Sequence, residues 1–400
     1  MKVGICGVGH FGNCFVPLFQ AHPGVTELVV ADELEERARE SAELFGVERV
    51  MGSLEELCES DVDAIALFTQ RHLHGPHSIQ ALRAGKHVYS AVPAASSVDH
   101  LAEMVEIVER TGQIYMTGET SYYYPATIYC RDRFRAGDFG RFAYAEAQYL
   151  HDMEHFYSAF NRTEGEDWKR IAGFPPMYYP THSTSMVLSV TGAHVTHVSC
   201  LGFVDDHEDE IFREGNNNWD NVFSNESALM RTSDGGALRI NEMRRVGWGG
   251  NNGVYMSLFG TEGAFEENGI SSCFSTRTPG SAVDLTATLE CEGMVGHIHL
   301  PESLQISMGS EFYAGTCSLH PTDRLPASFK GKPNGHFGSH QFLVDDFVQA
   351  VTTGSTPPCN VWNSANWCAP GLVAHESAKR KGELLEVPFW LKPAGGRDGR

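Results

Sequence analysis

KVGICGVGHFG, residues 2–12, is the stretch that decides the fold of the first part of this chain. Its first five residues are mostly apolar, as in a strand that is buried inside a sheet. The strand leads directly into Gly7-x-Gly9-x-x-Gly12, and a helix is predicted over residues 11–20. Glycines at this spacing permit a tight turn, a close approach of backbone N–H groups to a phosphate, and close packing of helix against strand. The stretch therefore predicts a dinucleotide site at Gly7, Gly9, His10, Phe11 and Gly12.

A second predicted strand, residues 28–31, ends on Asp32, which follows Gly12 at the spacing expected of a ribose-binding acid. A carboxylate there accepts hydrogen bonds from the ribose hydroxyls of NAD and repels the 2′-phosphate of NADP. We therefore expect NAD as the cofactor. The alternative, a structural turn without a ligand, is disfavoured because strand, glycines, helix and acid occur together.

Composition and charge restrict the class of protein. A chain of 400 residues predicts two domains. The formal net charge of −21 argues against nucleic acid and anionic membranes as partners, and the acidic run over residues 205–210 predicts a solvated loop. The first strand begins almost at Met1, which leaves no room for a signal peptide. The ten cysteines form no C-x-x-C pair, so we expect reduced thiols in a cytoplasmic protein.

Strand and helix patterns alternate over residues 1–120. Further strands are predicted at 64–68, 87–90 and 114–117, and further helices at 35–45, after Ser53, at 76–84 and at 97–110. This alternation predicts βαβ units and a doubly wound parallel sheet, the α/β class.

The pattern changes after Gly118. Alternating segments at 141–150, 227–232, 237–243 and 254–259 predict half-buried antiparallel strands, while helices are predicted at 124–136, 182–190, 341–351 and 370–381. Residues 276–335 lack a clear period and are not assigned. The prediction is an α+β domain over residues 121–400 with an open, mostly antiparallel sheet. An uncovered apolar face of that sheet predicts a homo-oligomer.

Three further stretches, together with the glycine loop, resemble the glucose–fructose oxidoreductase/inositol dehydrogenase family (Gfo/Idh/MocA). They are residues 69–74 with 81–88, residues 134–140, and residues 347–350 with 374–382. The resemblance covers nearly the whole chain. It implies a Rossmann domain that binds NAD, a second domain that binds a small carbohydrate, and cofactor contacts from Thr69, His74 and Pro93.

Two motifs depart from the pattern of this family. Its fifth strand usually ends in Glu-Lys-Pro, whose Lys lies beside the nicotinamide and the substrate hydroxyl, but this chain has Ala91-Val92-Pro93. Its second catalytic motif places an Asp four residues before a His, but here Tyr178 precedes His182. Only the His is retained, so this chain lacks the Lys that assists alcohol oxidation in the family.

His182 is the expected base for the substrate hydroxyl, and a structural His at the start of a helix is the alternative. Tyr178 or Tyr179 can donate to the same oxygen in place of the missing groups, and packing in an aromatic core is the alternative for both. Glu119, a second catalytic candidate, and Tyr122 follow the sixth strand. Because ligands bind beyond the carboxyl ends of the strands in such sheets, we expect both near the substrate.

Further candidates are His151, Asp152 and His155. Two His four residues apart share one face if the segment is helical and can hold a divalent metal. The segment follows a strand and has no Cys nearby, so we expect hydrogen bonds to sugar hydroxyls and no metal. Arg244 and Trp248, at a strand end before a Gly-rich turn, are expected to line a sugar pocket.

The predicted function is NAD-dependent oxidation of a hydroxyl group of a sugar, sugar derivative or glycoside. A redox-neutral glycoside hydrolase is the first alternative, in which NAD oxidises a ring hydroxyl, a base eliminates the glycosidic substituent, water adds and the hydride returns. The second alternative is a non-catalytic regulator that binds NAD.

Overall fold

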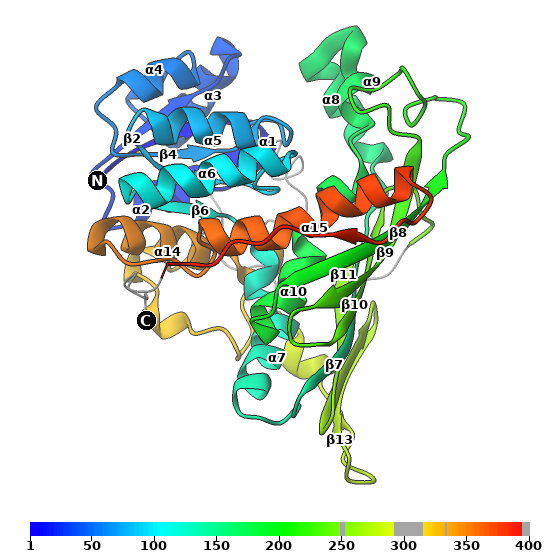
Figure 1. Cartoon of the computed structure of the whole chain (residues 1–400). Helices are drawn as coiled ribbons and strands as arrows, with labels where there is room; N and C mark the ends of the chain where they lie inside the picture. Colours follow the sequence, from blue (N-terminus) through cyan, green and yellow to red (C-terminus); the bar gives the residue numbers. More distant parts are fainter. Residues whose placement is uncertain (249–252, 292–314, 333, 394–400) are drawn as a thin grey trace. The chain divides into compact units, whose positions relative to one another are not determined.

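The computed structural model describes residues 1–248, 253–291, 315–332 and 334–393, apart from the side chains at 155, 159 and 164. It forms two compact units (Figure 1). Unit 1 comprises Met1–Ile128, Thr288–Ala365 and Trp390–Arg400, and unit 2 comprises Tyr129–Ala287 and Asn366–Phe389. The two domains expected from the sequence, residues 1–120 and 121–400, remain a prediction.

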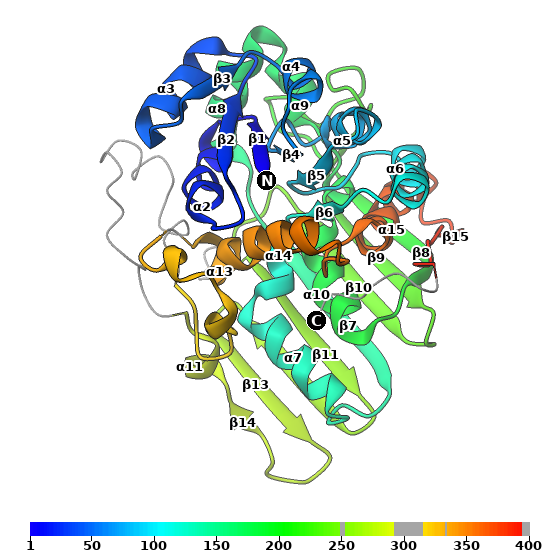
Figure 2. The same ribbon diagram turned by 90° about the vertical axis from the view of Figure 1, so that its left-hand side faces the viewer.

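Unit 1 contains a six-stranded parallel sheet (Figure 2). Its strands are β1 (Lys2–Cys6), β2 (Glu27–Ala31), β3 (Arg49–Met51), β4 (Ala64–Leu67), β5 (His87–Ser90) and β6 (Tyr115–Thr117). Their order is β3-β2-β1-β4-β5-β6, and each neighbouring pair is parallel. The sheet grows in opposite directions from β1 and β4, which is the doubly wound topology. This confirms the predicted class of the N-terminal domain.

The helices of this part are α1 (His10–Asn13), α2 (Val16–Ala21), α3 (Glu35–Phe45), α4 (Leu54–Glu59), α5 (His74–Arg83) and α6 (Val98–Thr111). The hydroxyl of Ser53 accepts from the N–H of Glu56 (3.2 Å) and so caps α4. Gly46 ends α3 in the left-handed region (φ +67°), as a C-terminal glycine predicts.

One helix prediction was wrong in detail. The helix expected over residues 11–20 is two helices, because α1 ends at Asn13 and α2 begins at Val16. Pro17 explains the break: it has no N–H to donate to the carbonyl of Asn13, and its ring crowds the preceding turn. The segment between them tightens instead, with the N–H of Phe15 bonded to the carbonyl of Gly12 (3.0 Å).

The C-terminal part of the chain completes the core of unit 1. Helix α14 (His340–Thr353) confirms the helix predicted at 341–351, and its Phe347 is fully buried. The Phe347 ring lies 6.3 Å from that of Phe19 in α2 and 5.6 Å from that of Tyr89 in β5. Aromatic rings at these separations pack with favourable edge contacts. Unit 1 is therefore built from segments far apart in the sequence.

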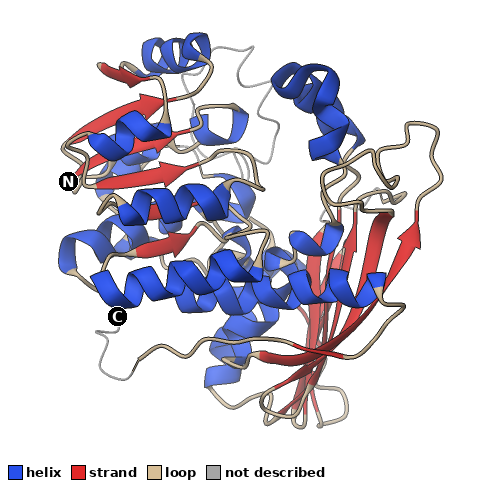
Figure 3. Cartoon of the chain, turned by 45° about the horizontal axis from the view of Figure 1, so that its top comes forward, coloured by secondary structure: helices blue, strands red, loops and turns tan. Residues whose placement is uncertain are grey.

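Unit 2 contains a nine-stranded sheet (Figure 3). Its strands are β7 (Phe142–Leu150), β8 (Val195–Val204), β9 (Phe223–Thr232), β10 (Ala237–Met243), β11 (Val254–Gly260), β12 (Gly263–Asn268), β13 (Ser271–Thr276), β14 (Val283–Asp284) and β15 (Leu385–Glu386). The order is β14-β13-β12-β11-β7-β10-β9-β8-β15, and every pair is antiparallel except β7 with β10. The predicted open, mostly antiparallel sheet is confirmed.

The helices of unit 2 include α8 (Tyr157–Glu164), α9 (Trp168–Ala172) and α10 (Thr181–Thr191). Helix α7 (Pro125–Arg135) begins in unit 1 and ends in unit 2, and α15 (Val361–Lys379) does the same. Helix α10 packs on β7, β10 and β11. On β8 and β9, Leu201, Phe203 and Leu229 are more than half exposed. This side of those strands is therefore uncovered within the described chain.

Candidate functional site

The glycine loop of unit 1 requires glycine at two of its three positions. Gly7 has φ +91°, and a Cβ atom there would lie 2.6 Å from the carbonyl oxygen of Phe68. A Cβ atom at Gly12 would lie 2.0 Å from the carbonyl oxygen of Gly7. At Gly9, by contrast, no heavy atom of the described chain lies within 4 Å of an added Cβ. The loop is thus held tightly at both ends and open in the middle, as a phosphate-binding loop requires.

His10 and Phe11 lie in α1, directly after Gly9. The loop that carries them follows β1 and lies at the switch point between β1 and β4, where ligands bind in doubly wound sheets. The buried edge of this loop is aromatic: the ring of Phe11 lies 5.2 Å from Phe15 and 5.9 Å from Phe68. The predicted contacts of these residues with NAD fit this position and stay a prediction.

Asp32 ties the glycine loop to the end of β2. Its carboxylate accepts from the N–H of Val8 (3.0 Å) and from the N–H of Leu34 (3.0 Å). The guanidinium of Arg37 lies 3.5 Å from the same carboxylate. Asp32 is 4% exposed, so it lines the floor of the loop rather than the open surface. A carboxylate here fits the ribose of NAD.

His74 joins the loops after β4 and β5. Its Nε2 lies 2.9 Å from the carbonyl oxygen of Thr69, and its Nδ1 lies 2.9 Å from that of Pro93. Burial lowers the pKa of His74 to about 4, although both carbonyls favour the charged ring. A neutral imidazole donates to only one of the two oxygens. The three residues that the family resemblance implies for NAD are thus brought together by one buried side chain.

In unit 2 a polar cluster forms where the parallel strands β7 and β10 end. Tyr149 and Glu242 are register partners on these strands. The guanidinium of Arg244 lies 4.5 Å from the ring centroid of Tyr149 and donates to Glu242 (2.7 Å). It also reaches the backbone carbonyl of Tyr179 (3.4 Å). Arg244 therefore holds the two strand ends and the segment before α10 together.

Glu242 is fully buried within this cluster. Its carboxylate accepts from the hydroxyl of Ser183 (2.6 Å) as well as from Arg244. Burial raises the pKa of Glu242 to about 7, because the loss of hydration outweighs the stabilisation from both donors. A carboxyl group with such a pKa exchanges its proton close to neutral pH, and strongly shifted groups of this kind mark functional sites.

His182 lies in the first turn of α10 and is 5% exposed. Its ring packs edge-on against Tyr149 (5.3 Å) and Tyr179 (5.4 Å), and His182 is among the groups that lower the pKa of Glu242 against the effect of burial. The N-cap residue of α10 is Pro180, whose side chain makes no capping hydrogen bond. The predicted roles of His182 and Tyr179 stay predictions.

His151 joins the same cluster through a short hydrogen bond between its Nδ1 and the hydroxyl of Tyr149. The neighbouring Asp152 is exposed and accepts from the N–H of Glu154 (2.9 Å). The side chain of His155 lies outside the described residues. Among the residues that are described, no three His, Cys, Asp or Glu side chains are arranged to hold a metal ion.

Two predicted residues of unit 2 have contacts elsewhere. Tyr178 packs against Phe174 (5.7 Å) and His375 (5.1 Å), and burial raises the pKa of its phenol to about 12. Trp248 packs against Tyr255 (5.8 Å) and is 37% exposed. None of these contacts joins Tyr178 or Trp248 to His182.

The acidic run at 205–210 is less solvated than predicted. The side chain of Asp205 is 2% exposed and lies 3.6 Å from the guanidinium of Arg245, which also pairs with Asp209. Arg245 further donates to the phenol oxygen of Tyr157 (3.2 Å). The prediction of a solvated loop was wrong for Asp205, which is buried against Arg245, whereas the side chain of Asp209 remains 36% exposed.

In unit 1, Glu119 lies two residues after the end of β6 and is the N-cap residue of the 3₁₀ helix η1 (Thr120–Tyr123). It is fully buried and accepts from the N–H (3.1 Å) and the hydroxyl (2.9 Å) of Ser121. The ring of Tyr122 packs on that of Tyr123 (5.0 Å). Val92 is 6% exposed in the loop after β5 and has no donor to replace a Lys. The roles proposed for Glu119 and Tyr122 are not tested by these contacts.

Sequence reasoning missed two members of the unit 2 cluster, Tyr149 and Glu242. Their meeting depends on the parallel pairing of β7 with β10, which no local pattern predicts. A signal for Glu242 was present, because Leu238, Ile240 and Glu242 alternate along β10 and all three are buried. A carboxylate in such an apolar series requires partners, and Arg244 and Ser183 supply them.

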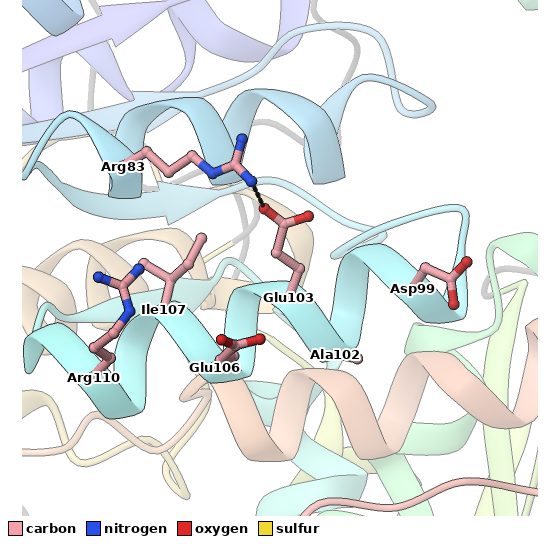
Figure 4. Close-up of a pocket in the computed structure, with 7 residues that line it drawn as sticks. All are labelled: Arg83, Asp99, Ala102, Glu103, Glu106, Ile107 and Arg110. Carbon is pink, nitrogen blue, oxygen red and sulfur yellow. Dashed lines mark ion pairs between the residues drawn. The ribbon is translucent and has the colours of Figure 1, made fainter.

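A separate hollow lies between α5 and α6 on unit 1 (Figure 4). It is lined by Arg83, Asp99, Ala102, Glu103, Glu106, Ile107 and Arg110. Arg83 and Glu103 form an ion pair across it. Its charges are of both signs, and none of its lining residues comes from a loop at the carboxyl end of a strand. It has the character of a solvated helix surface.

Comparisons with known proteins agree with this geometry. Residues 1–119 match the model of the GFO_IDH_MocA group, described as an oxidoreductase family with an NAD-binding Rossmann fold. A protein of Streptomyces filamentosus named Glycosyl hydrolase family 109 protein is 24% identical over 100% of this chain and 80% of its own. An Alpha-N-acetylgalactosaminidase of Bacteroides fragilis is 30% identical over 34% of each chain.

Solved structures share the whole fold. Levoglucosan dehydrogenase in complex with NADH and levoglucosan superposes with a TM-score of 0.71 at 17% identity, covering 97% of this chain and 99% of that one. UDP-N-acetylglucosamine 3-dehydrogenase from Acidithiobacillus ferrooxidans gives a TM-score of 0.62 at 17% identity, covering 95% and 98%. Residues 1–119, which carry the glycine loop, therefore match this family of NAD-binding oxidoreductases, and the chain shares its two-sheet fold with these two dehydrogenases.

Proposed function

We propose that this chain is an NAD-dependent oxidoreductase that acts on a hydroxyl group of a sugar, sugar derivative or glycoside. The observation that carries the proposal is the buried cluster of unit 2, in which Arg244 and Glu242 support the rings of Tyr149, Tyr179 and His182. Burying polar groups costs free energy, and buried groups with strongly shifted pKa values, such as Glu242, cluster at functional sites. The sugar dehydrogenases that share the fold support a carbohydrate as substrate.

NAD, when bound at the glycine loop, supplies the hydride acceptor. His182 accepts the proton of the hydroxyl group that is oxidised. Glu242 interacts electrostatically with His182 within the same buried cluster. The phenols of Tyr149 and Tyr179 serve as donors to the substrate oxygen, in the role that the Lys has where the Glu-Lys-Pro motif is intact. Arg244 keeps both rings in place.

A second candidate is redox-neutral hydrolysis of a glycoside. The full-length relatives named Glycosyl hydrolase family 109 protein favour it, and so does Val92 in place of the usual Lys. Oxidation of a ring hydroxyl acidifies the C–H bond beside the new carbonyl. A base, for which Glu119 is the candidate, removes that proton and the glycosidic oxygen leaves with the bonding electrons. Water then adds, and the returning hydride restores the alcohol.

The two candidates differ in whether hydride leaves the enzyme. The test incubates the full chain with a panel of glycosides and free sugars in deuterated water, with substoichiometric NAD and no other oxidant. Net oxidation gives a keto sugar and NADH in amounts limited by the NAD added. Hydrolysis gives many turnovers of free sugar carrying deuterium next to the oxidised carbon, without NADH.

A matched variant identifies the base in either case. His182→Ala should lower turnover by about a hundredfold or more, the usual contribution of a positioned base, and leave the affinity for NAD unchanged. Near-normal turnover in the variant contradicts the role of His182. Turnover that is absent from the unmodified chain with every substrate favours the non-catalytic regulator.

No helix in the described parts of the chain is long and apolar enough to cross a membrane. We also propose that the protein works in the cytoplasm, since its ten cysteines, all among the described residues, carry free thiols. The homo-oligomer predicted from the sequence belongs to the same proposal and is argued below from the exposed side chains of β8 and β9.

A further inference from the structure

A thiol pair with a histidine lies in unit 1, apart from the residues assigned above. The Sγ atom of Cys317 is 3.4 Å from Nδ1 of His320, and the thiol of Cys291 is hydrogen-bonded to that of Cys317. Cys317 and His320 are buried, whereas Cys291 is partly exposed. Two thiols and an imidazole in mutual contact differ from the isolated buried cysteines that fill cores.

The histidine is fixed in one tautomer by its neighbours. Its Nδ1 accepts from the backbone N–H of Cys317 (3.1 Å), so its proton is on Nε2, which donates to the carbonyl of Tyr123 (3.0 Å). The ring is also stacked on Phe342, with centroids 5.4 Å apart. The nitrogen that faces the Cys317 sulfur is therefore a proton acceptor held in place.

The surroundings shift the pKa values of the two thiols in opposite directions. Donation from Cys291 lowers the pKa of Cys317, and His320 and a backbone N–H act in the same direction against burial. The pKa of Cys291 is raised in turn, because it donates to its partner. Elsewhere in unit 1, burial raises the pKa of Cys58 to about 11. The thiolate, the form that reacts with oxidants, is thus favoured at Cys317.

We propose that Cys317 and Cys291 are a redox-sensitive pair that hydrogen peroxide converts into an intramolecular disulfide. The thiolate of Cys317 attacks one peroxide oxygen, the O–O bond breaks, and Cys317 sulfenic acid and hydroxide form. The sulfur of Cys291 then attacks the sulfenic sulfur, the S–OH bond breaks, and a disulfide and water form. Two thiols and one peroxide give one disulfide and two waters. In a reducing compartment such disulfides are transient and serve as sensors.

The test treats the reduced full-length protein with one to five equivalents of hydrogen peroxide, alkylates the remaining thiols and maps the products by mass spectrometry. Digestion after Glu is needed, because no Lys or Arg lies between the two cysteines. The expected result is a loss of two of the ten thiols and a cross-linked pair of peptides that contain Cys291 and Cys317. Absence of this cross-link at five equivalents overturns the proposal.

Two variants assign the roles. In Cys291→Ser the sulfenic acid of Cys317 has no partner, so dimedone should label it stoichiometrically, and no label there contradicts the proposal. Cys58→Ser, a partly exposed thiol of the same unit, is the matched control and should leave the cross-link unchanged.

The rate of alkylation in the unmodified chain tests whether Cys317 is the reactive thiolate, and it requires no variant. At pH 6, iodoacetamide should modify Cys317 at least tenfold faster than Cys58. Equal rates, or faster labelling of Cys58, overturn the assignment of Cys317 as the thiolate.

Discussion

At Asp32 a single carboxylate decides between two cofactors. It excludes a 2′-phosphate by charge, but Arg37 stands 3.5 Å away and is the kind of partner that a 2′-phosphate finds in NADP enzymes. Asp32→Ala should therefore weaken NAD binding and free Arg37, so that the preference for NAD over NADP falls by about tenfold, ~1.4 kcal/mol. Calorimetric titration with both cofactors measures the ratio.

The double variant Asp32→Ala/Arg37→Ala is the control for this prediction. Without the guanidinium, NADP should lose the affinity that the single variant gained. An unchanged ratio in Asp32→Ala would show that the loop selects its cofactor by other means.

Glu242 should make stability depend on pH. Its pKa is raised from 4.5 to about 7 in the folded chain, so between these values the folded state binds more protons than the unfolded state. Stability from this group is present below pH 4.5 and is lost as pH rises through 7. Glu242→Gln removes that dependence. The stability of the unmodified chain relative to the variant should fall by on the order of 2–3 kcal/mol from pH 4.5 to 8.

Melting temperatures of both proteins across this pH range provide the measurement. The absolute difference also contains the cost of leaving Arg244 without its buried partner, so only the slope with pH is diagnostic. Glu266→Gln, at an exposed carboxylate of β12, should show no such slope relative to the unmodified chain. A flat difference for Glu242→Gln would mean that this carboxyl is ionised throughout.

The unit 2 site could be predicted in part because four of its side chains follow recognisable sequence positions. His182 and Tyr179 precede or begin a helix, and His151 and Arg244 follow strands. Tyr149 and Glu242 could not be predicted, since paired residues of β7 and β10, such as Leu150 and Met243, are 93 residues apart in the sequence. A contact at that separation depends on the sheet as a whole.

At the scale of elements, different glycines of the glycine loop serve cofactor binding and the stability of the fold. Gly9 has φ −70° and open space where a Cβ would point, so Gly9→Ala should fold with a melting temperature within about 2 °C of the unmodified chain. The added methyl should nevertheless obstruct the pyrophosphate and weaken NAD by at least about tenfold. Gly12→Ala places a Cβ 2.0 Å from a carbonyl oxygen and should lower the melting temperature by several degrees.

Thermal melts without cofactor, together with NAD titrations of each variant, distinguish the two effects. A large loss of stability in Gly9→Ala, or full NAD affinity in it, would contradict the assignment of this glycine to the phosphate. Gly12→Ala with unchanged stability would contradict the packing argument.

Proline and a strand irregularity explain where the elements departed from prediction. The sequence predicts a helix that begins at Pro370, but this residue lies inside α15, which begins at Val361. The next residue, Gly371, would place a Cβ 2.1 Å from the carbonyl oxygen of Met177, so the segment before α10 packs closely against α15 beside the proline. Strand β8 was missed because register shifts at both of its ends disturb the alternation.

At the scale of the whole molecule, the class of fold and the cofactor could be predicted from the sequence. Hydrophobic runs and glycines specify βαβ units locally. The sequence did not predict that residues 288–365 belong to unit 1. Their place there depends on contacts such as those of Phe347 with Phe19 and Tyr89, which lie far earlier in the sequence. Buried aromatic packing of this kind leaves only a generic amphipathic pattern in α14.

The exposed side of β8 and β9 leads to the last prediction, a homo-oligomer. Leu201 (65% exposed), Phe203 (58%) and Leu229 (56%) present apolar side chains to solvent on adjacent strands. A monomer rarely leaves such a patch uncovered, and burying each side chain is worth ~1.5–3 kcal/mol. Light scattering should therefore give a multiple of 44.0 kDa. Leu201→Asp/Leu229→Asp should shift the mass toward the monomer with unchanged circular dichroism, whereas Val50→Asp, at a 39% exposed apolar residue of β3, should not. A monomeric unmodified chain, or an oligomer that withstands both charges, would assign this face another role.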